Sequence, residues 1–226
     1  MPSHERVSPR LLRQERKSRC CYHSGVSDAQ NSSSACNLRT VFLDRDGVLN
    51  RKMPEGRYVA SWADFHLLPG VPEAIARLNR AGQRVIVVTN QRGVALGKYT
   101  SADVVAIHSK FQEVLRGSGA HVDGFFFCPH DKGQCNCRKP LTGLFGQAVA
   151  RFPDIQAETS AVIGDSLSDI EFGRRLGMLT VLVEGDALSR KPGFEKAVEL
   201  ADLHFPSLPD AVSGLLAGFP QSQRPS

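Results

Sequence analysis

Two carboxylates end an apolar stretch in VFLDRDGVLN, residues 41 to 50 of the chain. An extended backbone directs residues i and i+2 to the same side, so Asp44 and Asp46 can converge on one point where the strand ends. Converging carboxylates repel each other unless they share a proton or a cation, and a divalent metal ion is the natural partner. A solvated turn is the alternative, because Asp before Gly is common in turns.

Other polar side chains follow other apolar stretches of the chain. Thr89 and Asn90 end RVIVVTN, Arg138 and Lys139 follow a Cys/His loop after VDGFFFC, and Asp165 ends SAVIGD. If these stretches are strands of one parallel sheet, four successive strand ends bring carboxylates, a hydroxyl, an amide and cations to one edge. If Asp44 and Asp46 only formed a solvated turn, the polar residues at the other three strand ends would be there by chance. The convergence therefore favours a functional site.

This set of side chains suits the hydrolysis of a phosphate ester. A carboxylate beside a metal ion can attack phosphorus, which divides the hydrolysis into formation and breakdown of an aspartyl phosphate. Asp44 is the better nucleophile because it ends the rigid strand, while Asp46 can protonate the leaving oxygen and later activate water. Thr89 can donate a hydrogen bond to a phosphoryl oxygen, Lys139 can neutralise charge on the transferring group, and Asp165 can complete the metal site.

A second metal site is indicated by the segment FCPHDKGQCNCRKP. It spaces three cysteines and a histidine as C-x-H-x4-C-x-C, a set suited to closed tetrahedral Zn²⁺, with the ligands Cys128, His130, Cys135 and Cys137. Because no coordination position is left open, we expect this zinc to stiffen the loop and hold Arg138 and Lys139 over the phosphate, and not to catalyse. Unligated loop thiols are the alternative.

The elements that must position these residues alternate between strand and helix. The patterns predict strands at residues 40–43, 84–90, 122–128, 160–165 and 179–185. They predict helices at residues 71–81, 101–116, 144–151 and 168–176, with Ser101 as an N-cap. This alternation predicts an α/β fold, a mostly parallel sheet with helices on both faces and ligands at the carboxyl ends of the strands.

The chain of 226 residues is long enough for one α/β domain. We predict that this domain spans residues 39–218, between a disordered basic tail at residues 1–38 and a disordered C-terminus at residues 219–226. Residues 1–39 hold seven basic and three acidic residues, so they carry +4 of the net charge of +5 and the remainder only +1. We therefore expect no nucleic acid partner. A transit peptide and a start codon placed too far upstream are two other interpretations of the tail.

The cysteines and the hydropathy indicate the compartment. Three of the six cysteines lie in the tail, and the other three lie within ten residues of one another, which indicates metal binding and not disulfides. The sequence shows neither a membrane-spanning stretch nor a secretory signal. We therefore expect a cytoplasmic monomer without a membrane partner.

Four segments carry a family resemblance. In this order, LDRDGVLN, VVTNQRG, CRKP and VIGDSLSDI resemble the four motifs of the haloacid dehalogenase-like (HAD) phosphohydrolases, over residues 40 to about 185. The resemblance implies a Rossmann-like HAD core and a Mg²⁺ cofactor bound by Asp44, Asp46 and Asp165. It also implies that Asp46 offers the metal its backbone carbonyl and keeps its carboxyl for acid/base work. Asp169 would support the metal site, unless it is a solvated acid in the first turn of a helix.

The zinc-binding loop narrows this resemblance. CPH followed by CxCRKP resembles the histidinol phosphatase and heptose bisphosphate phosphatase subgroup of the HAD enzymes, which has no large cap domain. TNQRGVALGKYT and GRYVASWADFHLLPGV look more like the heptose enzymes. The segment between Asn50 and Tyr58 is longer than the heptose pattern, however, and the zinc loop is as short as in the histidinol enzymes.

We therefore predict a Mg²⁺-dependent phosphomonoesterase that removes the 7-phosphate of a heptose 1,7-bisphosphate. Its substrate is a small phosphorylated metabolite, and Arg138 can bind the second anionic group, helped by Arg92 and Lys98. An ion pair with a loop carboxylate is the alternative for Arg138. The predicted substrate-binding residues are Arg45, Asn90, Gln91, Arg92 and Arg138. Histidinol-phosphate phosphatase activity and a zinc-stiffened binding module without turnover are the two alternative functions.

Overall fold

The computed structural model of the protein describes residues 38–54, 56–185 and 192–218. The predicted tails lie outside the described residues, apart from Leu38, which packs against the core. The described residues all belong to one compact unit. No helix among them is long and apolar enough to cross a membrane.

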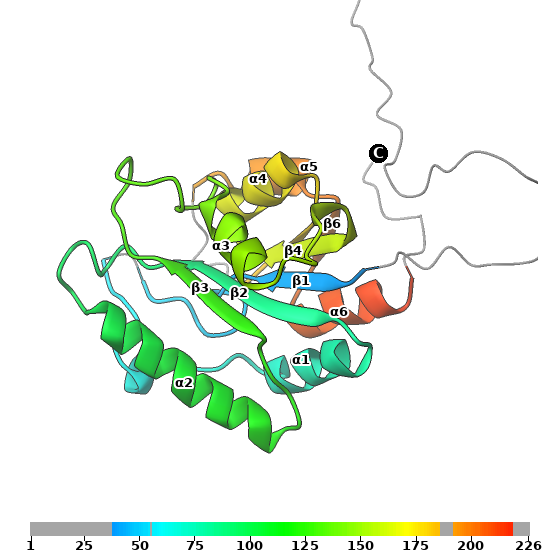
Figure 1. The fold of residues 1–226 in the computed structure, drawn as a ribbon, viewed down its shortest axis with the longest axis horizontal. Helices are drawn as coiled ribbons and strands as arrows, with labels where there is room; N and C mark the ends of the chain where they lie inside the picture. The colour runs from blue at the N-terminus through cyan, green and yellow to red at the C-terminus, as the bar shows by residue number, and fades with distance from the viewer. Residues whose placement is uncertain (1–37, 55, 186–191, 219–226) are drawn as a thin grey trace, which may run out of the picture. The chain divides into compact units, whose positions relative to one another are not determined.

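Six parallel strands form the central sheet (Figure 1). The strands are β1 (Thr40–Leu43), β2 (Arg84–Asn90), β3 (Gly124–Cys128), β4 (Ser160–Gly164), β5 (Leu179–Val183) and β6 (Leu203–Phe205). They follow the order β3-β2-β1-β4-β5-β6, and Leu43 of β1 lies level with Val87 of β2 and Ile163 of β4. The order reverses direction at β1 and β4, so the crevice beyond their carboxyl ends is where ligands bind in such sheets.

Helices cover both faces of the sheet (Figure 1). One face carries α1 (Val71–Arg80), α2 (Ser101–Gly117) and α6 (Leu208–Leu216), and the other carries α3 (Gly143–Arg151), α4 (Leu167–Leu176) and α5 (Phe194–Leu200). Two short 3-10 helices lie at Trp62–Asp64 and Ala157–Thr159. This is the predicted α/β architecture.

The core is continuous across the sheet because its central strands are apolar on both faces. In β1, Val41 and Leu43 pack with α1, α2 and α6, whereas Phe42 packs with α3 and α4. All four residues of β1 are buried. Burial of each large apolar side chain stabilises the fold by about 1.5–3 kcal/mol, so this strand is a rigid base for the residues that follow it.

The structure corrects three details of the predicted elements. Thr100, not Ser101, is the N-cap of α2: its hydroxyl accepts a hydrogen bond from Asp103 N at 3.2 Å, and the Asp103 carboxylate accepts one from Thr100 N at 2.8 Å. The strand predicted from residue 122 begins at Gly124. The elements α5, β6 and α6 were not predicted.

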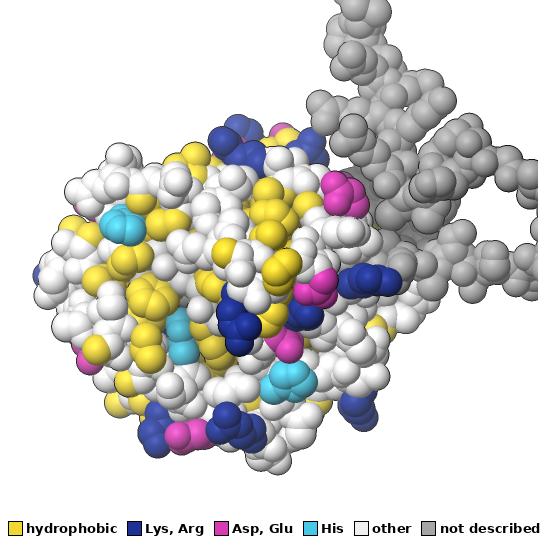
Figure 2. Space-filling model, in the orientation of Figure 1, with side chains coloured by type: hydrophobic (Ala, Val, Ile, Leu, Met, Phe, Trp, Pro, Cys, Tyr) yellow, Lys and Arg dark blue, Asp and Glu magenta, His cyan; other side chains and the backbone are white. Residues whose placement is uncertain are grey.

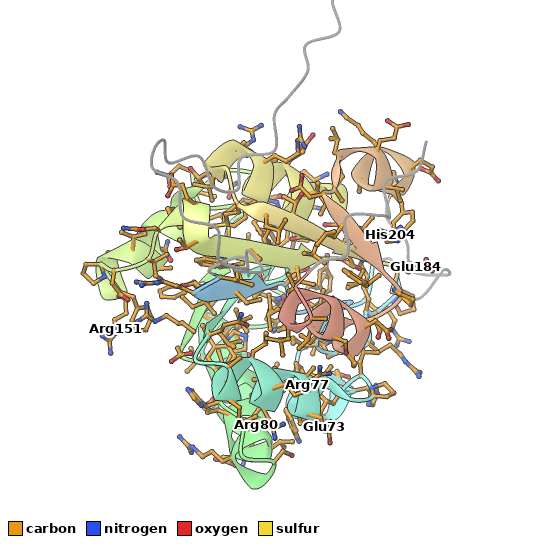
Figure 3. All side chains as sticks on the ribbon, turned by 90° about the vertical axis from the view of Figure 1, so that its right-hand side faces the viewer. Glu73, Arg77, Arg80, Arg151, Glu184 and His204 are labelled. Atoms are coloured by element: carbon orange, nitrogen blue, oxygen red, sulfur yellow. The ribbon has the colours of Figure 1, made fainter. Side chains whose placement is uncertain are left out.

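The unpredicted α6 completes the cover of one sheet face beside α1. Arg77 on α1 lies directly below α6 in Figure 3 and donates a hydrogen bond of 2.8 Å to Ser213 Oγ. Figure 2 shows Lys and Arg side chains scattered over one face of the protein among neutral and acidic ones.

Candidate active site

Lys139 lies between two carboxylates beyond the end of β1. Its ammonium nitrogen is 2.8 Å from Asp44 Oδ1 and 2.6 Å from Asp169 Oδ1, and it donates a hydrogen bond to the Val88 carbonyl at 2.6 Å. Lys139 is 3% exposed. Burial alone would lower the pKa of Lys139, but Asp169 and Asp44 raise it well above its ordinary value. The ammonium group therefore remains charged in the buried site.

Asp169 is fully buried and belongs to this cluster. Its carboxylate accepts hydrogen bonds from Ser166 Oγ at 2.6 Å and Ser166 N at 3.2 Å, which forms a capping box at the start of α4. Gly164 permits the close approach, because a Cβ atom there would lie 2.2 Å from Asp169 Cβ. The interpretation of Asp169 as a solvated acid is therefore wrong. The capping box and Lys139 direct its carboxylate into the site.

Asp165 is the third buried carboxylate and follows β4 directly. It packs against Gly47, where a Cβ atom would lie 2.2 Å from Asp165 Oδ2. The ammonium group of Lys52 contacts the same oxygen. Burial raises the pKa of Asp165 to about 6, since the charges of Asp44 and Asp169 add to the effect and only Lys52 opposes it. A further cation near Asp165 would be favourable.

Asp44, Asp165 and Asp169 form a site that suits Mg²⁺. Each offers one carboxylate oxygen, and the three oxygens lie within 4.8 Å of one another. Such oxygens are the ligands that Mg²⁺ prefers. Asp165 Oδ1 is buried and has no hydrogen-bond partner among the described residues, so it can take a metal ion. The Asp46 carboxylate lies outside this cluster, and the predicted use of its backbone carbonyl as a ligand stays a prediction.

The Asp46 carboxylate is held by three side chains. Arg45 donates to it through Nε at 3.1 Å and Nη2 at 2.9 Å, while Asn50 Nδ2 and Gln91 Nε2 donate at 3.0 Å and 2.9 Å. Burial alone would raise the pKa of Asp46, but the Arg45 charge and the hydrogen bonds from Asn50 and Gln91 hold it below its usual value. The structure therefore stabilises the ionised form of Asp46, which is the form that can accept a proton from water.

Gln91 connects this network to Thr89. It is 2% exposed, and it also donates to Thr89 Oγ1 at 2.9 Å. Tyr99 Oη donates to Gln91 Oε1 at 2.7 Å, which fixes the orientation of the amide. Thr89 Oγ1 accepts this hydrogen bond, which leaves its own proton for another acceptor, and the predicted bond to a phosphoryl oxygen stays a prediction.

Arg45 and Asn90 have contacts that differ from the predicted substrate contacts. Arg45 is 1% exposed and binds Asp46, although its Nη1 is buried without a hydrogen-bond partner among the described residues, and Gln91 is 2% exposed. Asn90 Nδ2 donates to the Lys139 carbonyl at 3.1 Å, and Asn90 Oδ1 accepts from Lys139 N at 3.0 Å. Adjacency to the strand end suggested substrate binding in sequence, but the side chains point back into the protein.

The four predicted zinc ligands come together. The Sγ atom of Cys128 is 3.8 Å from His130 Nδ1 and 3.5 Å from Cys135 Sγ, and Cys137 Sγ is 3.4 Å from His130 Nδ1. A tetrahedral zinc site with ordinary bond lengths separates its ligand atoms by about 3.5–3.8 Å. The cluster could therefore hold Zn²⁺, and Cys137 leads directly into Arg138 and Lys139.

The two arginines predicted to bind the remote part of the substrate differ in their surroundings. Arg92 pairs with Asp131 of the zinc loop through Nε and Nη2, the latter at 3.2 Å, so its charge is engaged within the protein. Arg138 Nη1 is buried and has no hydrogen-bond partner among the described residues. Arg138 therefore has a buried donor without a partner, whereas Arg92 has two of its three nitrogens engaged in an ion pair.

Sequence reasoning missed three polar residues at the site. Asn50 ends LDRDGVLN and Tyr99 lies in TNQRGVALGKYT, so both stand in recognised segments, and their polar groups were a usable signal. Lys52 had no such signal, because it lies in an irregular segment, and no spacing rule connects it to a strand end 113 residues later.

Comparisons with known proteins agree with this geometry. The family model for HAD-hydrolase-like proteins matches residues 136–211. A D-glycero-alpha-D-manno-heptose-1,7-bisphosphate 7-phosphatase of Mycobacterium tuberculosis is 40% identical over 169 residues, which cover 74% of this chain and 86% of the relative. A D-glycero-beta-D-manno-heptose-1,7-bisphosphate 7-phosphatase of Bordetella bronchiseptica is 39% identical over 149 residues, 65% of this chain and 81% of the relative.

A solved structure shows the same fold. The crystal structure of D,D-heptose 1,7-bisphosphate phosphatase from B. bronchiseptica, complexed with magnesium and phosphate, matches with a TM-score of 0.69 and 32% identity. The match covers 80% of this chain and 99% of that chain. The chain therefore belongs to the family of HAD-like phosphatases that includes the heptose 1,7-bisphosphate 7-phosphatases.

Proposed function

We propose that the protein is a Mg²⁺-dependent phosphatase that hydrolyses the 7-phosphate of D-glycero-D-manno-heptose 1,7-bisphosphate through an aspartyl phosphate. The observation that carries the proposal is the position of Lys139, between Asp44 and Asp169 and at the carboxyl ends of β1 and β4. A nucleophile, a fixed cation and a carboxylate set for a metal ion meet at the ligand-binding edge of the sheet. Phosphoryl transfer requires this combination of positioning and charge stabilisation.

In the first half of the reaction, a carboxylate oxygen of Asp44 attacks phosphorus and the bond from phosphorus to the sugar oxygen breaks. The negative charge of the bound phosphate favours protonation of Asp46, which then gives this proton to the leaving sugar oxygen. Lys139 and the Thr89 hydroxyl bind phosphoryl oxygens as charge redistributes among them. A magnesium ion on Asp44, Asp165 and Asp169 would reduce the repulsion between the attacking carboxylate and the phosphate.

In the second half, Asp46 is ionised and takes a proton from water. The water oxygen attacks phosphorus, the bond from phosphorus to Asp44 breaks, and inorganic phosphate leaves. The hydrogen bonds from Arg45 and Gln91 support this half, because they stabilise the ionised form of Asp46. Asp46 ends this half protonated and Asp44 ends it ionised, as both are in the complex with the substrate.

The substrate assignment rests on the relatives and on cations near the site. The relatives above are named for heptose 1,7-bisphosphates of both anomers. Arg138 retains a free donor, and Arg57 and Lys98 line a hollow of about 430 Å³ together with Tyr58. The Tyr58 ring lies 5.9 Å from that of Tyr99, so this hollow adjoins the Asp46 network. These cations support binding of a second phosphate.

The test compares substrates and one arginine variant. The zinc-loaded enzyme is assayed with both anomers of heptose 1,7-bisphosphate, with histidinol phosphate and with a chromogenic monophosphate, each with and without Mg²⁺ in buffer that contains no chelator. Arg138→Ala should lower kcat/KM for the bisphosphate by about ten- to a thousandfold, and much less for the chromogenic ester. Arg116→Ala is the control, since Arg116 is exposed in the last turn of α2, at the opposite edge of the sheet.

The alternatives give distinct results. A large preference for histidinol phosphate would overturn the heptose assignment and leave the phosphatase mechanism intact. Absence of Mg²⁺-dependent hydrolysis with every ester would refute the enzyme and favour a zinc-stiffened binding module.

A further inference from the structure

Lys52 is a buried cation that the proposed reaction does not use. It lies outside the four motifs, in the segment before Tyr58 that is longer than the heptose pattern. Its side chain is 9% exposed, and its ammonium group contacts Asp165 Oδ2, whose side chain is 5% exposed. A lysine side chain is rarely so enclosed unless it is paired. The contact joins two segments that are 113 residues apart in the chain.

The charges around the metal site explain why this contact forms. Lys139 contacts both Asp44 and Asp169, whereas Lys52 contacts Asp165. An isolated buried carboxylate is costly, and Lys52 supplies the countercharge that Asp165 needs in the absence of a metal ion. A magnesium ion on Asp165 would supply the same countercharge. Lys52 and the metal ion thus act on one carboxylate.

We propose that Lys52 is a resident countercation of Asp165 that competes with Mg²⁺ and sets the affinity of the protein for the metal. The inference rests on the proposed magnesium site. A monovalent and a divalent cation about 5 Å apart repel each other enough to weaken metal binding about tenfold even in water, and more in a buried site. Removal of the Lys52 charge should therefore tighten Mg²⁺ binding.

A positioning effect would act in the opposite direction, but close packing also orients the Asp165 carboxylate. Loss of a hydrogen bond that orients a metal ligand commonly weakens metal binding. Here, the carboxylate of Asp165 is already enclosed, and Gly47 packs so closely against Oδ2 that even a methyl group would not fit. Repulsion therefore outweighs orientation.

The experiment measures Mg²⁺ affinity directly. Isothermal titration of the zinc-loaded full-length protein compares the wild type with Lys52→Met, which keeps the apolar stem without the charge, and Lys52→Arg, which keeps the charge. Lys110→Met is the control, because Lys110 pairs with Glu113 on the exposed face of α2. We expect the Kd for Mg²⁺ to fall about tenfold or more in Lys52→Met and to change less than about threefold in the other two variants.

Thermal unfolding gives a second readout. In buffer without Mg²⁺ and without a chelator, zinc-loaded Lys52→Met should unfold at a lower temperature than the wild type, because Asp165 loses its countercharge, and saturating Mg²⁺ should remove the difference. If Lys52→Met does not fold without metal, Lys52→Gln is titrated in its place. A Kd that is unchanged or higher in the uncharged variants, with binding by the wild type, would overturn this inference alone. Absence of Mg²⁺ binding by the wild type would refute the proposed function as well.

Discussion

Asn90→Ala tests whether the position of Lys139 limits the reaction. Asn90 makes two hydrogen bonds to the Lys139 backbone, at 3.1 Å and 3.0 Å, and alanine removes both. Because a neutral hydrogen bond contributes about 1 kcal/mol net, the free energy of unfolding should fall by about 2 kcal/mol. The ammonium group of Lys139 should also lose its fixed place beside Asp44.

The kinetic effect follows from that loss of position. A displacement of about 1 Å in a catalytic group can cost about a hundredfold in rate, so we expect kcat to fall about ten- to a hundredfold. KM should change less than about threefold, and all phosphate esters should be affected alike, because Asn90 has no substrate contact in this account. If Asn90 bound the substrate, as the sequence suggested, KM for the heptose bisphosphate would rise selectively.

The assay combines steady-state kinetics with urea unfolding of the same preparations. Asn79→Ala is a matched control, because Asn79 Oδ1 also accepts a backbone hydrogen bond, from His121 N at 2.9 Å, at the far end of α1. The control should lose about 1 kcal/mol of stability and keep its kcat. A folded Asn90→Ala enzyme with kcat within about twofold of the wild type would refute the reasoning.

Three further variants test the zinc site, a buried histidine and a close packing contact. Cys135→Ser should lower zinc content from about one equivalent and reduce kcat, which elemental analysis and kinetics check; full activity without zinc would contradict it. His108 stacks on Phe125, and burial lowers its pKa to about 3. Below about pH 6.5, the unfolded chain therefore binds a proton at His108 that the folded protein does not bind. Folding should therefore lose about 2 kcal/mol between pH 6.5 and 5, and His108→Phe should flatten this slope in urea titrations, whereas an unchanged slope would disprove the assignment. Gly164→Ala places a Cβ atom 2.2 Å from Asp169 Cβ, so it should cost about 1–3 kcal/mol of stability and weaken Mg²⁺ binding; unchanged Mg²⁺ affinity in calorimetry would show that the close packing is dispensable.

Sequence predicted the sheet because its strands carry strong local patterns. β1 and β2 are apolar on both faces and end in polar motifs, so both their type and their functional edge could be recognised. The last elements lack such patterns. β6 has only three residues, with one exposed and two half-buried side chains, and it is a strand because β5 pairs with it.

The residues of the candidate site also differ in whether a local sequence pattern identifies them. The meeting of Asp44 with Lys139 and the Cys/His cluster could be predicted, because each residue has a chemical type and a spacing that few other roles require. Lys52 could not, because only the folded chain brings it to Asp165. Asn90 shows a third case: its position at a strand end was informative, but its direction toward the Lys139 backbone depends on a loop that the sequence does not place.

The covalent intermediate on Asp44 is the central claim, and one measurement tests it most directly. The enzyme is mixed with heptose 1,7-bisphosphate and Mg²⁺, quenched in acid within one turnover, reduced with borohydride and analysed by peptide mass spectrometry. An aspartyl phosphate is reduced to homoserine, so we expect homoserine at position 44 in the wild type, none at position 46, and none in Asp44→Asn, whose turnover should fall by several orders of magnitude. Phosphate release at the wild-type rate with no modification at Asp44, or turnover by Asp44→Asn within about tenfold of the wild type, would contradict the account.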